Sequence, residues 1–380
     1  MSFLDSILVK RFHQKAIKEY IEIVVAKQLP LHGGVSGAGV YFIEAIVKFP
    51  GLEEKFKPRK IRCVIKSSAK EDFEVEKTIY GDLTEKLRAL FVDFASPGRR
   101  ALIDGRCFMI MPLLEDYQTL AYIAYHGNEK EVESSIAITL NGLDTLHFFG
   151  EDTRKGALEP MSLGRFLNTY LGSIHNGIER NLAAKDKGAF SLRSYLVDGK
   201  LFNSELVVNG EMIQPYAVCY EKLLCRLNEF APPYSTTSHG DCHSRNIMIN
   251  LQKPDLKFID IDKVSKTGDY IYDYGTLVSD LEVYNAILQC RKPAFQLNQL
   301  SGNEFSYRFK VPKNIGVAIN LIKEHIQQKT GETDKKWKER ILLSEARHLL
   351  DMASKTQDSE KAFVAYCEGL KCLNRLVEKN

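Results

Sequence analysis

The segment 238–250, with the sequence SHGDCHSRNIMIN, limits the possible folds of this chain more than any other feature. It places His239, Asp241, His243 and Asn246 in a short polar loop, and an apolar run follows at once. A short run of aliphatic residues next to a polar loop is typical of a buried strand. The segment therefore predicts a polar loop that leads directly into the first strand of a hairpin.

A second apolar run, KFIDID at residues 257–262, carries Asp260 where its apolar residues end. If the two runs pair as antiparallel strands, Asn246 and Asp260 meet at the same end of the hairpin. Amide and carboxylate oxygens are hard ligands of the kind that magnesium prefers. The two runs therefore predict a magnesium site close to Asp241.

Phosphoryl transfer needs this set of groups. A carboxylate orients the attacking hydroxyl and accepts its proton, while metal ions offset the charge of the phosphates. Protein kinases have a catalytic-loop Asp, an Asn five residues later and a metal-binding Asp after a short hairpin. Asp241, Asn246 and Asp260 follow in the same order, with the same first spacing. The alternative is a zinc site at His239 and His243, which the complete pattern disfavours.

The segment resembles the H-G-D-x-H-x-x-N signature of the aminoglycoside phosphotransferase and choline kinase superfamily, which has a protein-kinase-like fold. Every fixed position of the signature is present. Residues 257–275 resemble the downstream I-D-x-[DE] … G-D-x-x-x-D block of that family, and LNGLDTLH at 140–147 resembles its L-x-x-L-H helix. Two positions depart from the pattern, Cys242 and the pair Ser244-Arg245, which replaces a common Pro-Gly. We expect these departures to have small effects on the chemistry.

The resemblance implies a role for each matching residue. Asp241 would be the catalytic base, and Asp273 would brace the loop that carries it. Two residues would bind the metal ion, namely Asn246 and Asp260. Two histidines would support the structure of the loop, namely His239 and His243.

The N-terminal half supplies groups for binding the nucleotide. Lys66 ends the predicted strand IRCVIK, and Glu76 lies on the apolar face of a predicted helix over residues 71–90. A carboxylate that faces a core must be paired. We therefore expect Glu76 to pair with Lys66, which in the kinase pattern contacts the α- and β-phosphates.

Two further segments are candidates for nucleotide contacts. Glycine allows the backbone N–H groups of the loop GGVSGAG, residues 33–39, to approach phosphates. The candidate residues in this loop are Gly34, Ser36, Gly37 and Gly39. Met111 and Leu113 fall where the hinge of a kinase binds adenine.

The predicted elements favour a bilobal, protein-kinase-like α+β fold. Its N-terminal nucleotide-binding lobe, residues 1–111, would combine an antiparallel sheet with a helix, and its C-terminal lobe, residues 112–380, would be mainly helical. In the first lobe we predict a helix over 5–28, a hairpin of strands at 40–49 and 61–66, and a strand at 106–114. In the second lobe we predict helices at 129–149, within 160–230, at 278–290 and from about 315 onwards. The helical regions 150–235 and 278–380 would bind the acceptor.

Composition narrows the class of protein further. A chain of 380 residues suits two lobes, and its net charge of +3 is too small to indicate a nucleic-acid partner. Its 8 cysteines form no C-x-x-C pair, so neither a zinc ribbon nor a redox motif is visible, and scattered free thiols fit a reducing compartment. The N-terminus lacks the apolar core of a signal peptide, and no apolar run is long enough to span a membrane. We therefore expect a cytoplasmic protein.

We expect a kinase that uses Mg²⁺ and ATP or GTP to phosphorylate a hydroxyl group of a small molecule. The acceptor would be an aminoglycoside, an amino alcohol, a sugar or a homoserine-like compound, although the slightly basic composition disfavours a cationic aminoglycoside. The alternatives are a protein or lipid kinase on the same scaffold, an inactive nucleotide-binding pseudokinase and an AMP-transferring enzyme. No A-P-E motif follows Asp260, which argues against a regulated protein kinase.

Overall fold

The computed structural model of the chain contains two compact units. The first takes up residues 1–117 and 257–262, and the second takes up residues 118–256 and 263–380. Each unit is described by itself. The residues that the structure describes are 22–30, 39–48, 59–92, 100–103, 106–148, 161–172, 174–175, 178, 192, 194–198, 200–330 and 334–378.

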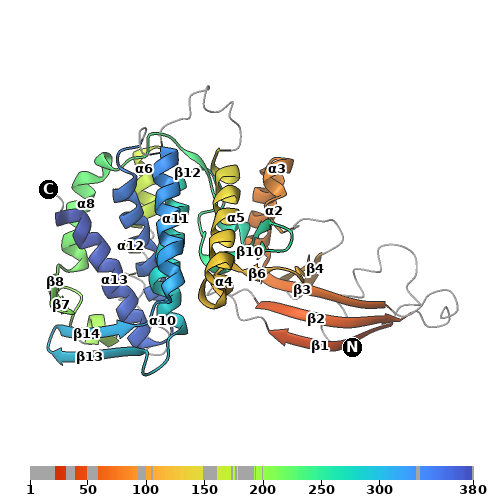
Figure 1. Ribbon diagram of the computed structural model, residues 1–380, viewed down its shortest axis with the longest axis horizontal. Coiled ribbons are helices and arrows are strands. Elements are labelled where there is room, and N and C mark those ends of the chain that lie inside the picture. Colours follow the sequence, from red (N-terminus) through yellow and green to blue (C-terminus); the bar gives the residue numbers. More distant parts are fainter. Residues whose placement is uncertain are drawn as a thin grey trace. The chain divides into compact units, whose positions relative to one another are not determined.

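The first unit is built on a five-stranded antiparallel sheet with the strand order β1-β2-β3-β5-β4 (Figure 1). Its strands are β1 (Glu22–Pro30), β2 (Gly39–Lys48), β3 (Arg59–Ala69), β4 (Arg100–Ile103) and β5 (Arg106–Pro112). Helix α2 (Lys70–Asp82) begins directly after β3, and the short helix α3 (Glu85–Arg88) follows it. The hairpin predicted for residues 40–49 and 61–66 is confirmed. The strand predicted at 106–114 is confirmed as β5, which ends at Pro112.

Two predictions for the first unit were wrong. Residues 22–28, predicted as the end of a helix over 5–28, belong to strand β1, whereas 5–21 lie outside the described residues. The β-branched residues Ile23, Val24 and Val25 favour a strand, and pairing along β2 satisfies its backbone. The single helix predicted over 71–90 is interrupted, because Leu83 is extended (φ −74°, ψ 147°) and Thr84 caps α3.

The second unit is mainly helical, as predicted. Its helices are α4 (Leu120–His126), α5 (Glu129–Phe148), α6 (Leu163–Leu167), α8 (Tyr216–Arg226), α9 (Tyr270–Ser279), α10 (Asn285–Gln289), α11 (Lys313–Thr330), α12 (Trp337–Lys355) and α13 (Ser359–Glu378). Turns of π-helix lie at η2 (Asn168–Gly172), η3 (Ser194–Asp198) and η7 (Asp280–Tyr284), and 3₁₀ turns lie at η4 (Leu227–Glu229) and η5 (Ser244–Asn246). A further 3₁₀ turn, η6 (Ile261–Lys263), begins in the first unit and ends in the second. No helix in the described part of the chain is long and apolar enough to cross a membrane.

Short strands complete the fold. They are β6 (Gln118–Thr119), β7 (Leu206–Val208), β8 (Glu211–Ile213), β9 (Thr236–Ser238), β10 (Ile247–Asn250), β11 (Asp255–Phe258), β12 (Ser265–Gly268), β13 (Phe295–Ser301) and β14 (Glu304–Phe309). The strand predicted at Ile247–Ile249 is confirmed as β10, which pairs antiparallel with β6. The sheet β13-β14-β7-β8 was not predicted. Its Asn209-Gly210 turn has positive φ at both residues, and this Asn-Gly pair is a sequence signal for a tight hairpin.

Helix α9 lies at the centre of the second unit, and all of its residues are buried. The predicted helix at 278–290 begins earlier than expected, because Asp269 caps α9 by accepting the N–H of Ile271 at 3.0 Å. The fully buried Arg340 of α12 holds this cap, with Nε 2.7 Å from Asp269 Oδ2 and Nη1 2.8 Å from Asp334 Oδ1. Buried charges require such partners. The N-terminus of α9 is therefore tied to α12.

Candidate active site

Lys66, Glu76 and Asp260 form one ion-pair cluster in the first unit. Lys66 Nζ donates to Glu76 Oε1 and to Asp260 Oδ1, each at 2.8 Å. Lys66 and Glu76 are buried, whereas the Asp260 side chain is 37% exposed. The pairing of Lys66 with Glu76 that the sequence predicted is present.

Local backbone geometry explains how these three side chains meet. Because α2 starts immediately after β3, Glu76 on its buried face turns back toward Lys66 in the strand. Strand β11 ends at Phe258, before Asp260 is reached, and Asp260 has a left-handed backbone with φ +58°. This conformation is uncommon outside glycine, although Asp adopts it more readily than most residues. Such strain is concentrated at functional sites.

The two neighbouring carboxylates keep Lys66 protonated. Burial lowers the pKa of Lys66, but the carboxylates of Asp260 and Glu76 outweigh this effect and raise it above its usual value. The lysine therefore stays protonated at neutral pH. A buried, permanently charged ammonium beside a partly exposed carboxylate is suited to holding phosphate and metal together.

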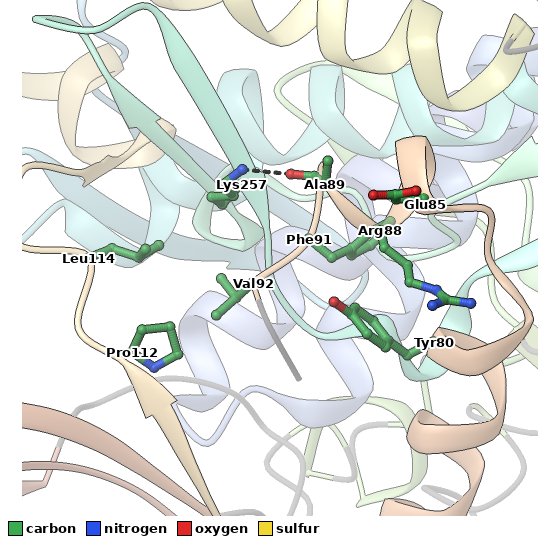
Figure 2. A pocket seen from close by; sticks show the side chains of 9 residues that line it. All are labelled: Tyr80, Glu85, Arg88, Ala89, Phe91, Val92, Pro112, Leu114 and Lys257. Atoms are coloured by element: carbon green, nitrogen blue, oxygen red, sulfur yellow. Dashed lines mark hydrogen bonds between the residues drawn. The ribbon is translucent and has the colours of Figure 1, made fainter. Parts of the chain in front are cut away.

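A pocket of about 480 Å³ lies elsewhere in the first unit (Figure 2). Its walls include Pro112 and Leu114 from the segment after β5, and Lys257, whose Nζ donates to the carbonyl of Ala89 at 2.6 Å. Met111 and Leu113 do not line it. Their predicted contact with adenine stays a prediction.

The glycine-rich loop is only partly described. Gly34, Ser36 and Gly37 lie outside the described residues. Gly39 is the first residue of β2 and pairs with Ser67, the neighbour of Lys66 in β3. Its contact with phosphate also stays a prediction.

In the second unit, the buried carboxylate of Asp273 holds the start of the polar loop that carries Asp241. Its Oδ2 accepts the N–H of His239 at 2.7 Å, and its Oδ1 accepts the N–H of Gly240 at 2.8 Å. Nε2 of His147, at the end of α5, lies 2.9 Å from the same carboxylate. Sequence reasoning gave His147 no role, although the L-x-x-L-H resemblance was the signal that pointed to it. Asp273 thus has the bracing geometry that the resemblance implies.

Close packing fixes the loop at Gly240. This residue has φ +78°, and an added Cβ would lie 2.4 Å from the carbonyl oxygen of Lys263. Only glycine fits both constraints without strain. The H-G-D sequence therefore has a structural need for its glycine.

Asp241 and Asn246 are linked within the loop. Asn246 Nδ2 donates to the backbone carbonyl of Asp241 at 3.0 Å, and the N–H of Asn246 donates to the carbonyl of His243 at 2.9 Å. Because the amide nitrogen is bonded, the amide oxygen of Asn246 is the atom that remains for a metal ion. Asn246 is buried, whereas the Asp241 residue is partly exposed.

The two histidines of the loop lie inward. His239 is fully buried, and its Nδ1 lies 3.3 Å from the N–H of Asp241. Burial lowers the pKa of His243, so its imidazole is neutral near pH 7. Among the described residues, no group of three or more His, Cys, Asp or Glu side chains could hold a metal ion by itself.

Sequence reasoning missed Asp280, a fully buried carboxylate that contacts the same loop. Its Oδ2 accepts the N–H of Ser244 at 2.7 Å. Arg245, the other residue that departs from the Pro-Gly pair of the signature, places its guanidinium 5.4 Å from the ring centre of Tyr284. No sequence motif marks Asp280, since it matches no fixed position of the signature.

The donor set fits magnesium. A carboxylate from Asp260 and an amide oxygen from Asn246 are hard ligands, and neither thiolate nor imidazole is needed. These two residues belong to different units, so their convergence stays a prediction.

Comparison with solved structures identifies the fold. The Plasmodium vivax ethanolamine kinase matches with 12% sequence identity and a TM-score of 0.50, over 98% of this chain and 87% of that one. A spectinomycin phosphotransferase in complex with ADP and spectinomycin matches over 94% of both chains, with 10% identity and a TM-score of 0.48. A GDP complex of an aminoglycoside 2′-phosphotransferase matches over 94% of this chain and 93% of that one, with 14% identity and a TM-score of 0.44.

No protein-family model and no curated protein sequence matches the chain. The likeness to the ethanolamine kinase concerns the fold, since the sequence identity is only 12%. The predicted fold class, an antiparallel sheet with a helix followed by a mainly helical part, is confirmed. The chain therefore has the protein-kinase-like fold of the ethanolamine kinase, as its resemblance to the aminoglycoside phosphotransferase and choline kinase superfamily indicated.

Proposed function

We propose that this protein is a magnesium-dependent phosphotransferase that transfers the γ-phosphoryl group of ATP or GTP to a hydroxyl group of a small molecule. The observation that carries the proposal is the ion-pair cluster of Lys66, Glu76 and Asp260. Burying the charges of Lys66 and Glu76 has a desolvation cost that their attraction offsets only in part, so a function is the better reason for keeping them there. In kinases the same set binds phosphates and metal.

Each residue has a separate task in this proposal. Glu76 orients Lys66, whose ammonium binds the α- and β-phosphates. Asp241 orients the acceptor hydroxyl and takes its proton as the oxygen attacks phosphorus. Asn246 and Asp260 hold Mg²⁺, which neutralises charge on the phosphates when bound.

The acceptor would lie against the helical regions 150–235 and 278–380. The protein would act in the cytoplasm. Amino alcohols belong in any search for it, because the solved structure that supports the fold is an ethanolamine kinase. Sugars, homoserine-like compounds and aminoglycosides are the other candidates. A protein or lipid acceptor is the competing possibility.

The proposal is tested by measuring nucleotide consumption over a panel of these hydroxyl compounds with ATP and with GTP. We expect turnover to depend on Mg²⁺ and to fall about 10²–10⁴-fold in Asp241→Asn, because a general base contributes that much. Nucleotide binding by this variant, measured by calorimetry, should change little. An Asp241→Asn protein with full activity would exclude the assigned base, and radiolabel on protein alone would favour a protein kinase.

A further inference from the structure

Ser244 stands where the family signature commonly has proline, and its contacts are ones that proline cannot make. Its N–H donates to Asp280 Oδ2 at 2.7 Å, and its Oγ donates to the same oxygen at 2.5 Å. Both residues are fully buried. Proline has neither an N–H nor a hydroxyl. Serine in place of proline at position 244 therefore allows two hydrogen bonds to a buried carboxylate from another element.

The helix that carries Asp280 is distorted at that residue. Asp280 begins the π-helical turn η7, and its carbonyl accepts the N–H of Asn285, five residues later. In a regular α-helix, side chains five residues apart point roughly 140° away from each other. The π turn brings the two side chains to one side, and Asn285 Nδ2 donates both to Asp280 Oδ2 and to Ser244 Oγ, each at 2.8 Å. Such π turns are frequent at functional sites.

Asp280 is ionised in this setting. Burial alone raises the pKa of its carboxyl, but His348, His243 and Arg245 lower it below the ordinary range. His348 on α12 has its Nε2 3.7 Å from Asp280 Oδ1. An ionised carboxylate accepts hydrogen bonds more strongly than a neutral group. Asp280 therefore holds Ser244 firmly.

The turn that Ser244 begins ends at Asn246. Its backbone is closed by the bond from the N–H of Asn246 to the carbonyl of His243, and the Asn246 side chain is bonded to the carbonyl of Asp241. Fixing Ser244 thus fixes the turn that sets the direction of the Asn246 amide. Asp273 holds the loop at His239 and Gly240, so two carboxylates from one helical run hold its two ends.

We propose that Asp280 is a positioning residue, which acts through Ser244 to keep the amide oxygen of Asn246 directed for metal binding. This inference rests on the proposed function, because metal binding by Asn246 is part of it. Residues that hold a metal ligand in place usually change the metal affinity about 10–100-fold when they are replaced.

The test measures Mn²⁺ binding in the presence of ADP, with free Mn²⁺ counted by electron paramagnetic resonance. Asp280→Asn keeps the side-chain shape and removes the charge, and we expect it to weaken Mn²⁺ binding about 10–100-fold. Asp144→Asn is the matched control, because the Asp144 carboxylate bonds to His325 and Lys329, each within 2.8 Å, and to the hydroxyl of Tyr274 at 3.4 Å, and none of these residues belongs to the loop. Its Mn²⁺ affinity should match that of the wild type.

A second measurement separates positioning from general stability. If Asp280 acts through Asn246, Asp280→Asn should cause no further loss of Mn²⁺ affinity in an Asn246→Ala background. Independent, additive losses would overturn the proposal. Should Asp280→Asn fail to fold, Ser244→Ala removes the two hydrogen bonds of the Ser244 hydroxyl, to Asp280 and from Asn285, and should still weaken Mn²⁺ binding several-fold.

The two hypotheses fail in different ways. Absence of Mn²⁺ and ADP binding in the wild-type protein would remove the proposed function and this inference with it. Wild-type binding that stays unchanged in a folded Asp280→Asn or Ser244→Ala variant would remove only the role of Asp280.

Discussion

At the scale of single residues, the pair of Lys66 and Glu76 shows how a buried charge constrains a fold. Two charges taken out of water are tolerable together, but one of them alone is not. The pair could be predicted, because Glu76 on an apolar helix face needs a partner and Lys66 lies on a nearby strand. Its second partner, Asp260, is 194 residues away from Lys66 in the chain, and the backbone at φ +58° that directs it has no sequence signal.

We expect Lys66→Met to lower the free energy of unfolding by about 3 kcal/mol, because it leaves Glu76 buried without its cation. Lys77→Met is the matched control, since Lys77 forms an exposed ion pair with Glu74 on α2, the helix that carries Glu76. Its free energy of unfolding should fall by less than about 0.5 kcal/mol. Urea unfolding measures both.

A double variant, Lys66→Met with Glu76→Met, should recover most of the stability while remaining inactive, since an apolar pair of similar volume packs without the charge penalty. Equal losses for Lys66→Met and Lys77→Met would contradict the argument that burial makes the difference.

At the scale of elements, the polar loop that carries Asp241 is held from outside by helix α9 and its π-helical extension. The loop residues themselves were predictable, because their order and spacing match a known signature. Their supports were predictable only in part: the resemblance indicated Asp273, but Asp280 follows no pattern. The break between α2 and α3 and the strand identity of β1 were also missed, since each depends on capping or pairing that periodicity alone does not reveal.

Close packing at the loop predicts that Gly240 tolerates alanine less well than Gly210, another glycine of the second unit. Gly210→Ala should cost only about 1 kcal/mol, because its φ of +80° is unfavourable for alanine but the space around it is open. Gly240→Ala adds a Cβ 2.4 Å from the Lys263 carbonyl, so we expect roughly 2 kcal/mol more and a loss of turnover. Urea unfolding and the nucleotide-consumption assay check this, and equal costs at the two positions would refute the packing argument.

At the scale of the whole molecule, stability should depend on pH through Glu345 of α12. Burial raises the pKa of its carboxyl from 4.5 to about 7, and Cys372 of α13 donates to it at 3.7 Å. The folded state therefore keeps a proton that the unfolded chain releases at lower pH. The contribution of Glu345 to the free energy of unfolding is therefore full below about pH 4.5. It declines as the pH rises toward 7 and stays low above that.

We expect Glu345→Gln to remove this decline and to raise the free energy of unfolding at pH 8 by on the order of 2–3 kcal/mol, since one pKa unit corresponds to about 1.4 kcal/mol. Urea unfolding at pH 5 and pH 8 measures the effect. Glu339→Gln, at a partly exposed position on the same helix that pairs with Lys336, is the control and should leave the pH dependence unchanged. The same decline in the Glu345→Gln variant would exclude this carboxyl as its source.

The sequence by itself determined the fold class, the loop with Asp241 and Asn246, and the partnership of Lys66 with Glu76. These follow from local order, from spacing and from the rule that a buried charge needs a partner. Only the tertiary structure decided which distant groups hold the loop and the central helix: Asp280 lies 36 residues from Ser244, and Arg340 lies 71 residues from Asp269. The physical reason is that the strength of such bonds depends on burial, and burial is a property of the packed molecule.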